Sequence, residues 1–121
     1  MDITSTFGDD FARDWIEAWN AHDLSRVLAH YTDDFEMSSP FITQFAGETS
    51  GTLQGKDKVA AYWRTGLERF PDLKFDLLQV LVGASSVVIY YRTSFGRKTA
   101  EVFFFNKAGL VEKAAAHYCD D

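Results

Sequence analysis

Two oppositely charged side chains in the second half of the chain, Arg92 and Glu101, are the residues best suited to chemistry. They flank the segment SFGRKT (residues 94–99), which predicts a β-hairpin with Gly96 at the first central position of a type II′ turn. A two-residue loop fixes the register, and counting back along both strands puts Arg92 directly opposite Glu101. We expect either a structural ion pair near the hairpin end or two polar groups that point together into a ligand pocket.

The same register sorts the other hairpin side chains onto two faces. Tyr90 and Phe103 share a face with Arg92 and Glu101, so this face combines aromatic walls with two polar groups. The opposite face is also apolar, and an exposed surface of this kind favours a second copy of the chain as its cover. We therefore predict a homodimer through the outer sheet face, centred on Ile89, Tyr91, Val102 and Phe104.

The other reactive residue types do not form a known catalytic or metal-binding motif. His22 and His30 fall at helix ends and His117 alternates with its neighbours on the last strand, without the i, i+4 spacing of a helical metal site. We therefore predict no metal. The single cysteine, Cys119, excludes an internal disulfide and is expected to be an incidental thiol. No glycine-rich phosphate loop or G-x-S-x-G elbow is visible.

Composition restricts the class of protein. A chain of 121 residues with 46% hydrophobic content can bury a core as one domain, residues 1–121. Its 16% aromatic content exceeds what such a core needs, which favours an aromatic-lined cavity. A net charge of -6 without a Lys/Arg cluster argues against nucleic acid as a partner. With no apolar run of about 20 residues and an acidic start, we expect a cytoplasmic protein that does not bind membranes.

The elements that must position these residues follow from periodicity. Helical spacing predicts one helix over residues 9–20, a short second helix capped by Asp23, and a third over residues 56–70 that ends before Pro71. A strand over residues 33–41, which Pro40 would confine to an edge or a bulge, precedes a loop over residues 43–55. Four strands joined by short turns are then predicted, over residues 73–83, 86–95, 98–106 and 110–118. This pattern indicates an antiparallel meander and an α+β fold.

This order of elements resembles the nuclear transport factor 2-like superfamily, in particular its SnoaL-like and ketosteroid isomerase-like members. The resemblance spans nearly the whole chain and is carried by WIEAWNAHDLSRVLAHYTDDFEMSSP, GKDKVAAYW, GRKT and FNKAGLVEKAAAHY. It implies a cone-shaped, cystatin-like fold in which a curved antiparallel sheet packs on three helices. It also implies a pocket on the concave sheet face, a homodimer through the outer face and no obligatory cofactor.

The resemblance to ketosteroid isomerase fails where that enzyme does its chemistry. Its general-base aspartate, which precedes a proline, corresponds to Ser39, and its oxyanion-hole tyrosine corresponds to Trp15. Only its second oxyanion-hole acid has a near counterpart, in Glu101. Because Ser39 has no carboxylate, proton abstraction beside a steroid carbonyl loses its base, and we reject steroid isomerase activity.

The resemblance therefore implies a SnoaL-like protein that binds a small, largely apolar organic molecule. We expect Glu101 to act as an acid or base whose pKa is raised by burial and lowered by Arg92. The predicted ligand-binding residues are Trp15, Trp19, Ser39, Trp63, Tyr90, Phe103 and Tyr118. Three functions stay open: an isomerase, cyclase or hydrolase without a cofactor, a non-catalytic ligand-binding protein, and a dimeric assembly domain.

Overall fold

The last four strands of the chain form the centre of the architecture. In the computed structural model, which describes residues 3–119, they pair in antiparallel order as predicted: β3 (Phe75–Val82), β4 (Ser86–Thr93), β5 (Lys98–Phe105) and β6 (Val111–Tyr118). Two further strands extend the sheet beside β6, namely β1 (Tyr31–Ser38) and then β2 (Thr52–Gln54). The helices are α1 (Ser5–Asn20), α2 (Leu24–Leu28), α3 (Pro40–Ala46) and α4 (Lys56–Arg69). The predicted α+β fold class is confirmed.

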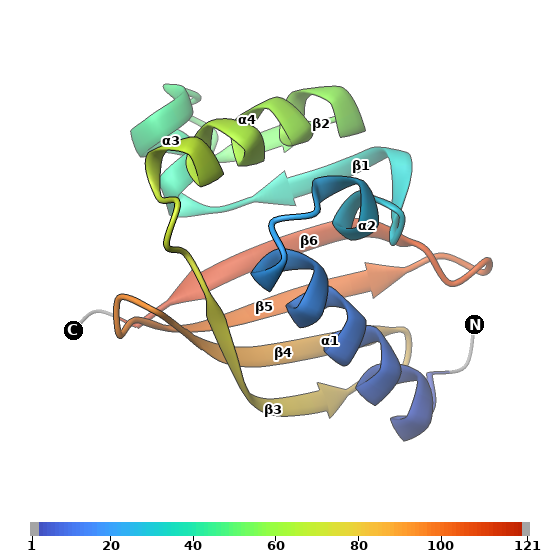
Figure 1. Ribbon diagram of the computed structural model, residues 1–121. Helices are drawn as coiled ribbons and strands as arrows, with labels where there is room; N and C mark the ends of the chain where they lie inside the picture. The colour runs from blue at the N-terminus through green and yellow to red at the C-terminus, as the bar shows by residue number, and fades with distance from the viewer. Residues whose placement is uncertain (1–2, 120–121) are drawn as a thin grey trace.

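The sheet is mixed, with the strand order β2-β1-β6-β5-β4-β3. One pair differs from the antiparallel expectation, since β1 runs parallel to β6. A short turn between two strands predicts that they pair antiparallel. Because most of the chain separates β1 from β6, no turn in the sequence predicts their pairing. Figure 1 shows α1 crossing the sheet and α4 lying beside β1 and β2.

A short helix, α3, occupies part of the segment that was predicted as a loop. Ser39 caps it by accepting a hydrogen bond from the backbone N–H of Phe41 at 3.2 Å, and Pro40 is the first helical residue. Gly47, with φ 73°, ends it in the left-handed conformation. Pro40 therefore starts a helix instead of confining the preceding strand to an edge, and β1 lies inside the sheet between β2 and β6.

The hairpin between β4 and β5 pairs Thr93 with Arg97, which leaves a loop of three residues, 94–96, instead of the predicted two. The backbone N–H of Thr93 donates to the carbonyl of Arg97 at 2.8 Å, and that of Gly96 donates to the carbonyl of Thr93 at 2.9 Å. Gly96 has φ 89°, as expected of a residue with positive φ, but it occupies the last loop position. This is the three-residue hairpin in which a type I turn is followed by a glycine in the left-handed region.

The longer loop makes the predicted register wrong. Arg92 pairs with Lys98, and Glu101 pairs with Ile89 instead of Arg92. Because the shift is an odd number of residues, it exchanges the two faces of β4 relative to β5. The inner face carries Ile89 and Tyr91 beside Glu101 and Phe103, whereas the outer face carries Tyr90 and Arg92 beside Val102 and Phe104.

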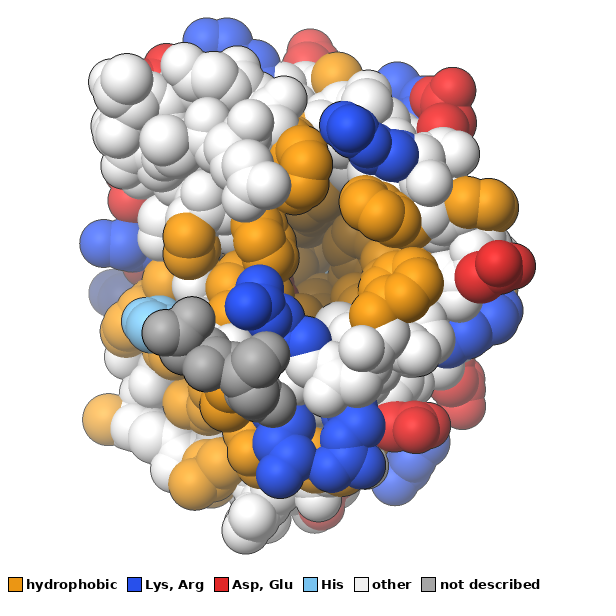
Figure 2. All heavy atoms as spheres, turned by 90° about the vertical axis from the view of Figure 1, so that its left-hand side faces the viewer, with side chains coloured by type: hydrophobic (Ala, Val, Ile, Leu, Met, Phe, Trp, Pro, Cys, Tyr) orange, Lys and Arg blue, Asp and Glu red, His pale blue; other side chains and the backbone are white. Residues whose placement is uncertain are grey.

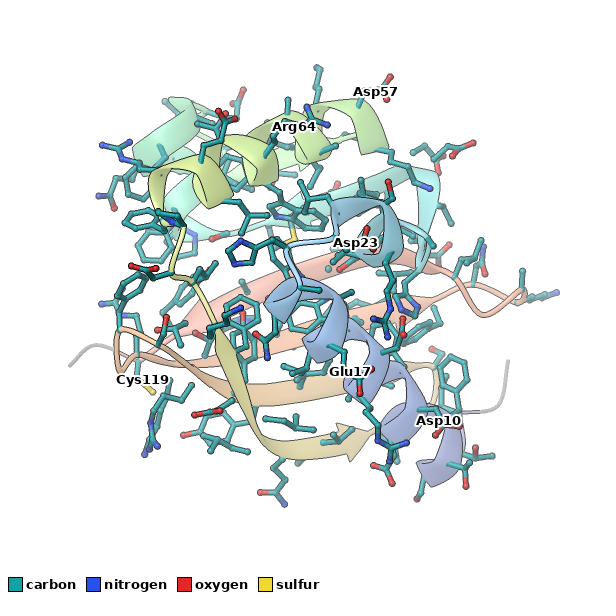
Figure 3. All side chains as sticks on the ribbon, viewed as in Figure 1. Asp10, Glu17, Asp23, Asp57, Arg64 and Cys119 are labelled. Carbon is teal, nitrogen blue, oxygen red and sulfur yellow. The ribbon has the colours of Figure 1, made fainter. Side chains whose placement is uncertain are left out.

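Helix α1 covers the inner face through its buried side. It begins four residues before the predicted start, because the Thr4 hydroxyl caps it by accepting from the N–H of Phe7 at 3.0 Å. Its buried aromatic residues Phe11, Trp15 and Trp19 pack toward the strands. The labelled charged residues of the two long helices, among them Glu17 on α1 and Arg64 on α4, lie on their outer sides (Figure 3).

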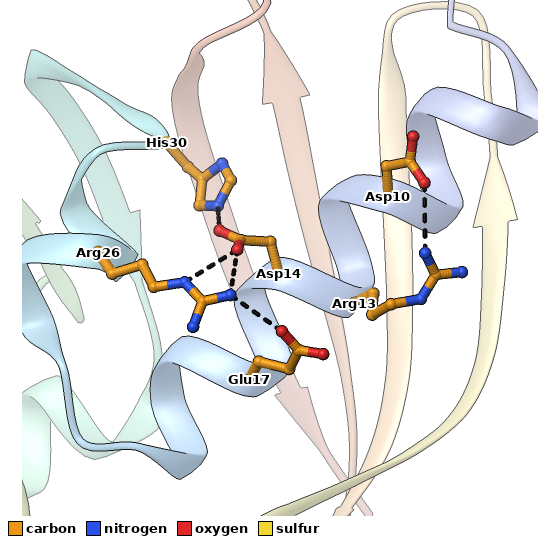
Figure 4. Close-up of polar contacts among 6 residues, drawn as sticks. All are labelled: Asp10, Arg13, Asp14, Glu17, Arg26 and His30. Carbon is orange, nitrogen blue, oxygen red and sulfur yellow. Dashed lines mark hydrogen bonds and ion pairs between the residues drawn. The ribbon is translucent and has the colours of Figure 1, made fainter.

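A polar cluster fixes α1 against α2 and the start of β1 (Figure 4). Asp14 accepts hydrogen bonds from Arg26 Nε at 2.9 Å and Nη2, and its second oxygen lies 2.6 Å from His30 Nε2. Arg26 also donates to Glu17 at 2.9 Å. Burial alone would raise the pKa of Asp14, but the hydrogen bonds from Arg26 and His30 outweigh it and leave this pKa below its usual value.

The C-terminal end of α1 is tied to the beginning of β3. Asn20 donates its side-chain N–H to the carbonyl of Phe75 at 3.0 Å and accepts from the N–H of the same residue at 2.7 Å. His22, which has a positive φ of 55°, places Nε2 2.8 Å from the carbonyl of Leu73. These contacts hold the segment between α4 and β3 in place.

In the described part of the chain, no helix is long and apolar enough to cross a membrane.

Candidate functional site

A cavity of about 1040 Å³ lies between the inner sheet face and helices α1, α3 and α4. Figure 2 looks into its opening, which is hollowed and bordered mostly by hydrophobic side chains. Ligand pockets in proteins are commonly about 300–1,000 Å³, so this cavity has room for a drug-sized molecule. Its walls include Trp19, Trp63 and Phe75, and four further lining residues are Phe41 and the exposed Phe45, Phe70 and Phe95.

Glu101 is the only carboxyl side chain that lines this cavity among residues 3–119. It projects from β5 on the inner face and is only 4% exposed. Burial raises the pKa of Glu101 to about 7, although a hydrogen bond donated by the Tyr91 hydroxyl to Oε1 at 3.0 Å acts in the opposite direction. Arg92, predicted to keep this carboxyl ionised, lies on the outer face, so burial decides the pKa.

The charge of Glu101 affects the pKa of four tyrosine side chains: Tyr31, Tyr62, Tyr91 and Tyr118. Burial raises the pKa of each phenol, to about 12 for Tyr62, and the negative charge of Glu101 adds to every rise. All four hydroxyl groups therefore keep their protons at neutral pH. Tyr62, Tyr91 and Tyr118 line the cavity, so their hydroxyls are potential hydrogen-bond donors to an occupant or to Glu101.

Ser39 lines the cavity, but its hydroxyl has a structural task. It accepts the capping hydrogen bond of α3 and donates to the Tyr118 hydroxyl at 3.4 Å. The position that the resemblance equates with a general base therefore holds a helix cap, and the cavity has its acid on β5 instead.

The tryptophans that line the cavity differ in what their indole N–H groups do. Trp15 donates to the Tyr31 hydroxyl at 2.9 Å, so this N–H is already used. The Nε1 of Trp19 is buried and has no hydrogen-bond partner within residues 3–119. An unpaired buried donor of this kind is costly, so the Trp19 indole destabilises the fold where it lies.

The predicted site residues fall into three groups. Those that line the cavity are Trp15, Trp19, Ser39, Trp63, Glu101 and Tyr118. Phe103 is buried behind the wall, with its ring 5.2 Å from that of Trp15. Tyr90 and Arg92 lie on the outer face because of the register shift.

Sequence reasoning missed two other lining residues near Glu101. Tyr91 was assigned to the outer face by the wrong register. Tyr62 falls within the helix predicted over residues 56–70, but it was not predicted as part of a site. The signal available in the sequence was that Tyr62 is adjacent to Trp63, which was predicted to bind the ligand.

Three basic side chains line the cavity: Lys58 and Arg69, which are exposed, and Arg97, which is half-buried. The guanidinium carbon of Arg97 lies 5.5 Å from the ring centre of Phe41 and 5.9 Å from that of Tyr118. That of Arg69 lies 5.1 Å from the ring centre of Phe45. Within residues 3–119, no three His, Cys, Asp or Glu side chains come together as potential metal ligands.

The sequence and structure were compared with known proteins. The profile of the SnoaL-like domain family matches residues 12–115. A SnoaL-like protein of unknown function from Burkholderia thailandensis is 52% identical, with 99% of this chain and 100% of that chain covered and a TM-score of 0.96. No curated protein shows significant similarity to the chain.

More distant structures share the fold at low sequence identity. A protein with a cystatin-like fold from Methylobium petroleophilum is 19% identical, with 100% and 81% of the two chains covered and a TM-score of 0.78. A proposed isomerase of the SnoaL-like family from Agrobacterium tumefaciens is 16% identical, with 95% and 99% covered and a TM-score of 0.76.

Proposed function

Because the chain belongs to the SnoaL-like domain family, we propose that its cavity binds a small, largely apolar organic molecule whose polar group contacts Glu101. The observation that carries this proposal is a buried carboxyl in the wall of an aromatic-lined cavity, which forms no ion pair with any basic side chain in residues 3–119. Apolar walls supply binding energy, while a few polar groups fix the orientation of the ligand. The cavity is not filled by the protein's own side chains, which argues against assembly as its sole role.

We further propose that Glu101 transfers a proton to or from this ligand. A carboxyl with a pKa of about 7 is present in both protonation states near neutral pH, which suits a general acid or a general base. The hydroxyls of Tyr62 and Tyr118 can donate hydrogen bonds to an oxygen atom that becomes negative during the reaction. Isomerisation and cyclisation without a cofactor can use a proton-transfer group and hydrogen-bond donors of this kind, and hydrolysis needs a water molecule in addition, which Glu101 would activate as a general base.

The test is a screen of hydrophobic small molecules that carry one carbonyl or hydroxyl group, read first by thermal shift and then by turnover. Glu101→Gln keeps the shape of the carboxyl and removes its titration, so we expect it to retain binding and to lower turnover about 100-fold or more. The matched control is Arg92→Gln, which changes a charged residue of the same hairpin on the outer face and should leave both readouts unchanged.

Two results would contradict the proposal in different ways. If no compound shifts the melting temperature of the wild type, the cavity does not bind this class of molecule. If Glu101→Gln turns over a discovered substrate at the wild-type rate, Glu101 does not transfer the proton. A ligand that binds without any turnover would favour a non-catalytic binding protein instead.

We also propose a homodimer through the outer sheet face, with a revised set of contact residues. The structure buries Ile89 and Tyr91 on the inner face, so these two residues cannot form the predicted interface. The outer face presents Phe104, which is 40% exposed, and Leu81, which is 49% exposed. Val88, Tyr90 and Val102 lie half-buried between them, and together they form the outer apolar patch: Leu81, Val88, Tyr90, Val102 and Phe104.

A further inference from the structure

The opening of the cavity has the opposite charge to the protein as a whole. The chain carries a formal net charge of -6, yet the charged side chains that line the cavity and reach solvent are Lys58, Arg69 and Arg97, whereas the lining acid Glu101 is buried. We propose that the ligand is an organic anion, whose carboxylate-type group binds Arg97 and Arg69 at the opening while its apolar body lies in the cavity. This inference rests on the proposed binding function and adds the charge and orientation of the ligand.

Arg97 is held in place by the hairpin and leaves its charge available. Its carbonyl accepts from the N–H of Thr93 at 2.8 Å, and its own N–H donates to the Thr93 hydroxyl at 3.3 Å. The side chain is half-buried over the rings of Phe41 and Tyr118. No acidic side chain in residues 3–119 forms an ion pair with this guanidinium group. A guanidinium that stacks on rings keeps its edge N–H groups free to bind an anion.

Arg69 reaches the cavity from helix α4, whereas Arg97 belongs to the β4–β5 hairpin. It belongs to the last turn of α4 and lies over Phe45, while Arg97 lies over Phe41. These two phenylalanine rings belong to α3 and are 5.8 Å apart. The two guanidinium groups therefore lie over neighbouring rings of the same short helix, and each can form a charge-assisted hydrogen bond with an anion. Among the described residues, Arg69 also forms no ion pair.

The interior of the cavity determines which way such a ligand lies. Glu101 in the wall repels a second negative charge, so an anionic group is disfavoured there and favoured at the opening. The hydroxyl of Tyr62, which lines the cavity, can donate a hydrogen bond to a neutral oxygen atom inside. The ligand that fits both ends carries a neutral carbonyl or hydroxyl oxygen within the cavity and its anionic group at the opening.

Two fluorescent probes with the same rings test the anionic group. 8-Anilinonaphthalene-1-sulfonate is an anion whose sulfonate stands in for the carboxylate, and N-phenyl-1-naphthylamine is its neutral counterpart. We expect Arg97→Gln to weaken binding of the anion about tenfold and to leave the neutral probe unchanged. Adding Arg69→Gln should weaken the anion further. Raising the salt concentration should weaken only the anion, because exposed charges are screened.

Two control variants separate this inference from the proposed function. Arg92→Gln removes a cation of the same hairpin on the outer face and should change neither titration. Gly66 lines the cavity, and a Cβ atom added there meets no atom within 4 Å, so we expect Gly66→Phe to fill space in the cavity and to weaken both probes. If neither probe binds, or Gly66→Phe has no effect, cavity binding itself fails, and the anion inference fails with it. If both probes bind in the cavity but Arg97→Gln weakens both or neither, only the anion inference is overturned.

Discussion

Glu101 couples the stability of the fold to pH. Burial raises the pKa of its carboxyl from 4.5 to about 7, with Tyr91 opposing this rise. Well below pH 4.5 the group is protonated in both states, and as the pH rises the unfolded chain ionises first. The free energy of unfolding therefore falls between about pH 4.5 and pH 7 and is constant above that window. At about 1.4 kcal/mol per pH unit, the total loss is about 3 kcal/mol.

Urea unfolding at pH 5 and pH 8 measures this loss. The wild type should be less stable at pH 8 than at pH 5, whereas Glu101→Gln should show little of this difference. Asp14 does not interfere, because its lowered pKa makes a contribution that is fully present above its unfolded value of 3.8 and is lost only as the pH falls below it. Equal pH dependence in the wild type and Glu101→Gln would show that the carboxyl is not desolvated in the folded protein.

The sequence was sufficient to find the tryptophans of the cavity wall and its acid, but not the partner of that acid. Helical spacing places Trp15, Trp19 and Trp63 on buried helix faces, and these residues do line the cavity. The pairing of Glu101 depends on the loop, however, and SFGRKT fits both a two-residue and a three-residue hairpin with Gly96 at positive φ. The two loops differ by an odd register shift, so one ambiguous turn moved Arg92 to the wrong face.

Helix α1 lies so close to β3 that one of its residues must be glycine. A Cβ atom at Gly8 would lie 2.5 Å from Cγ1 of Val82, and a β-branched side chain has few other rotamers to adopt. We expect Gly8→Ala to lower the free energy of unfolding by about 1 kcal/mol, although alanine favours a helix more than glycine does. Chemical denaturation of the variant measures this change.

Gly66 in α4 is the matched control for this prediction. A Cβ atom there meets nothing within 4 Å, so Gly66→Ala should raise the free energy of unfolding by up to about 1 kcal/mol. If both substitutions stabilise the protein, helix propensity alone decides, and the close approach of α1 to β3 does not limit the packing.

The helices and strands were predictable where their signals are local. Asp23 caps α2 as expected, and α4 ends just before Pro71. The short helix α3 was missed because its signal, Ser39 followed by Pro40, also fits the end of a strand. The parallel pairing of β1 with β6 depends on the packing of the entire chain and leaves no local pattern.

In a single copy of the chain, one face of the sheet is covered and the other is exposed to solvent. The helices cover the inner face, while the outer apolar patch has no cover from any element in residues 3–119. The patch is charge-poor at its centre, where Val88 and Val102 are paired neighbours. A sheet face of this kind suits an isologous contact, in which two copies present the same surface to each other.

Sedimentation at micromolar concentration tests this assembly, and we expect the wild type to be a dimer. Replacing Leu81 and Phe104 together by Asp should give a monomer, because four carboxylates would then face one another across the two-fold axis. Phe95→Asp is the matched control, since Phe95 is 62% exposed but borders the cavity opening on the β4–β5 loop, and this variant should stay dimeric. A monomeric wild type would exclude the interface. A Leu81→Asp, Phe104→Asp variant that stays dimeric would mean that the copies associate through another surface.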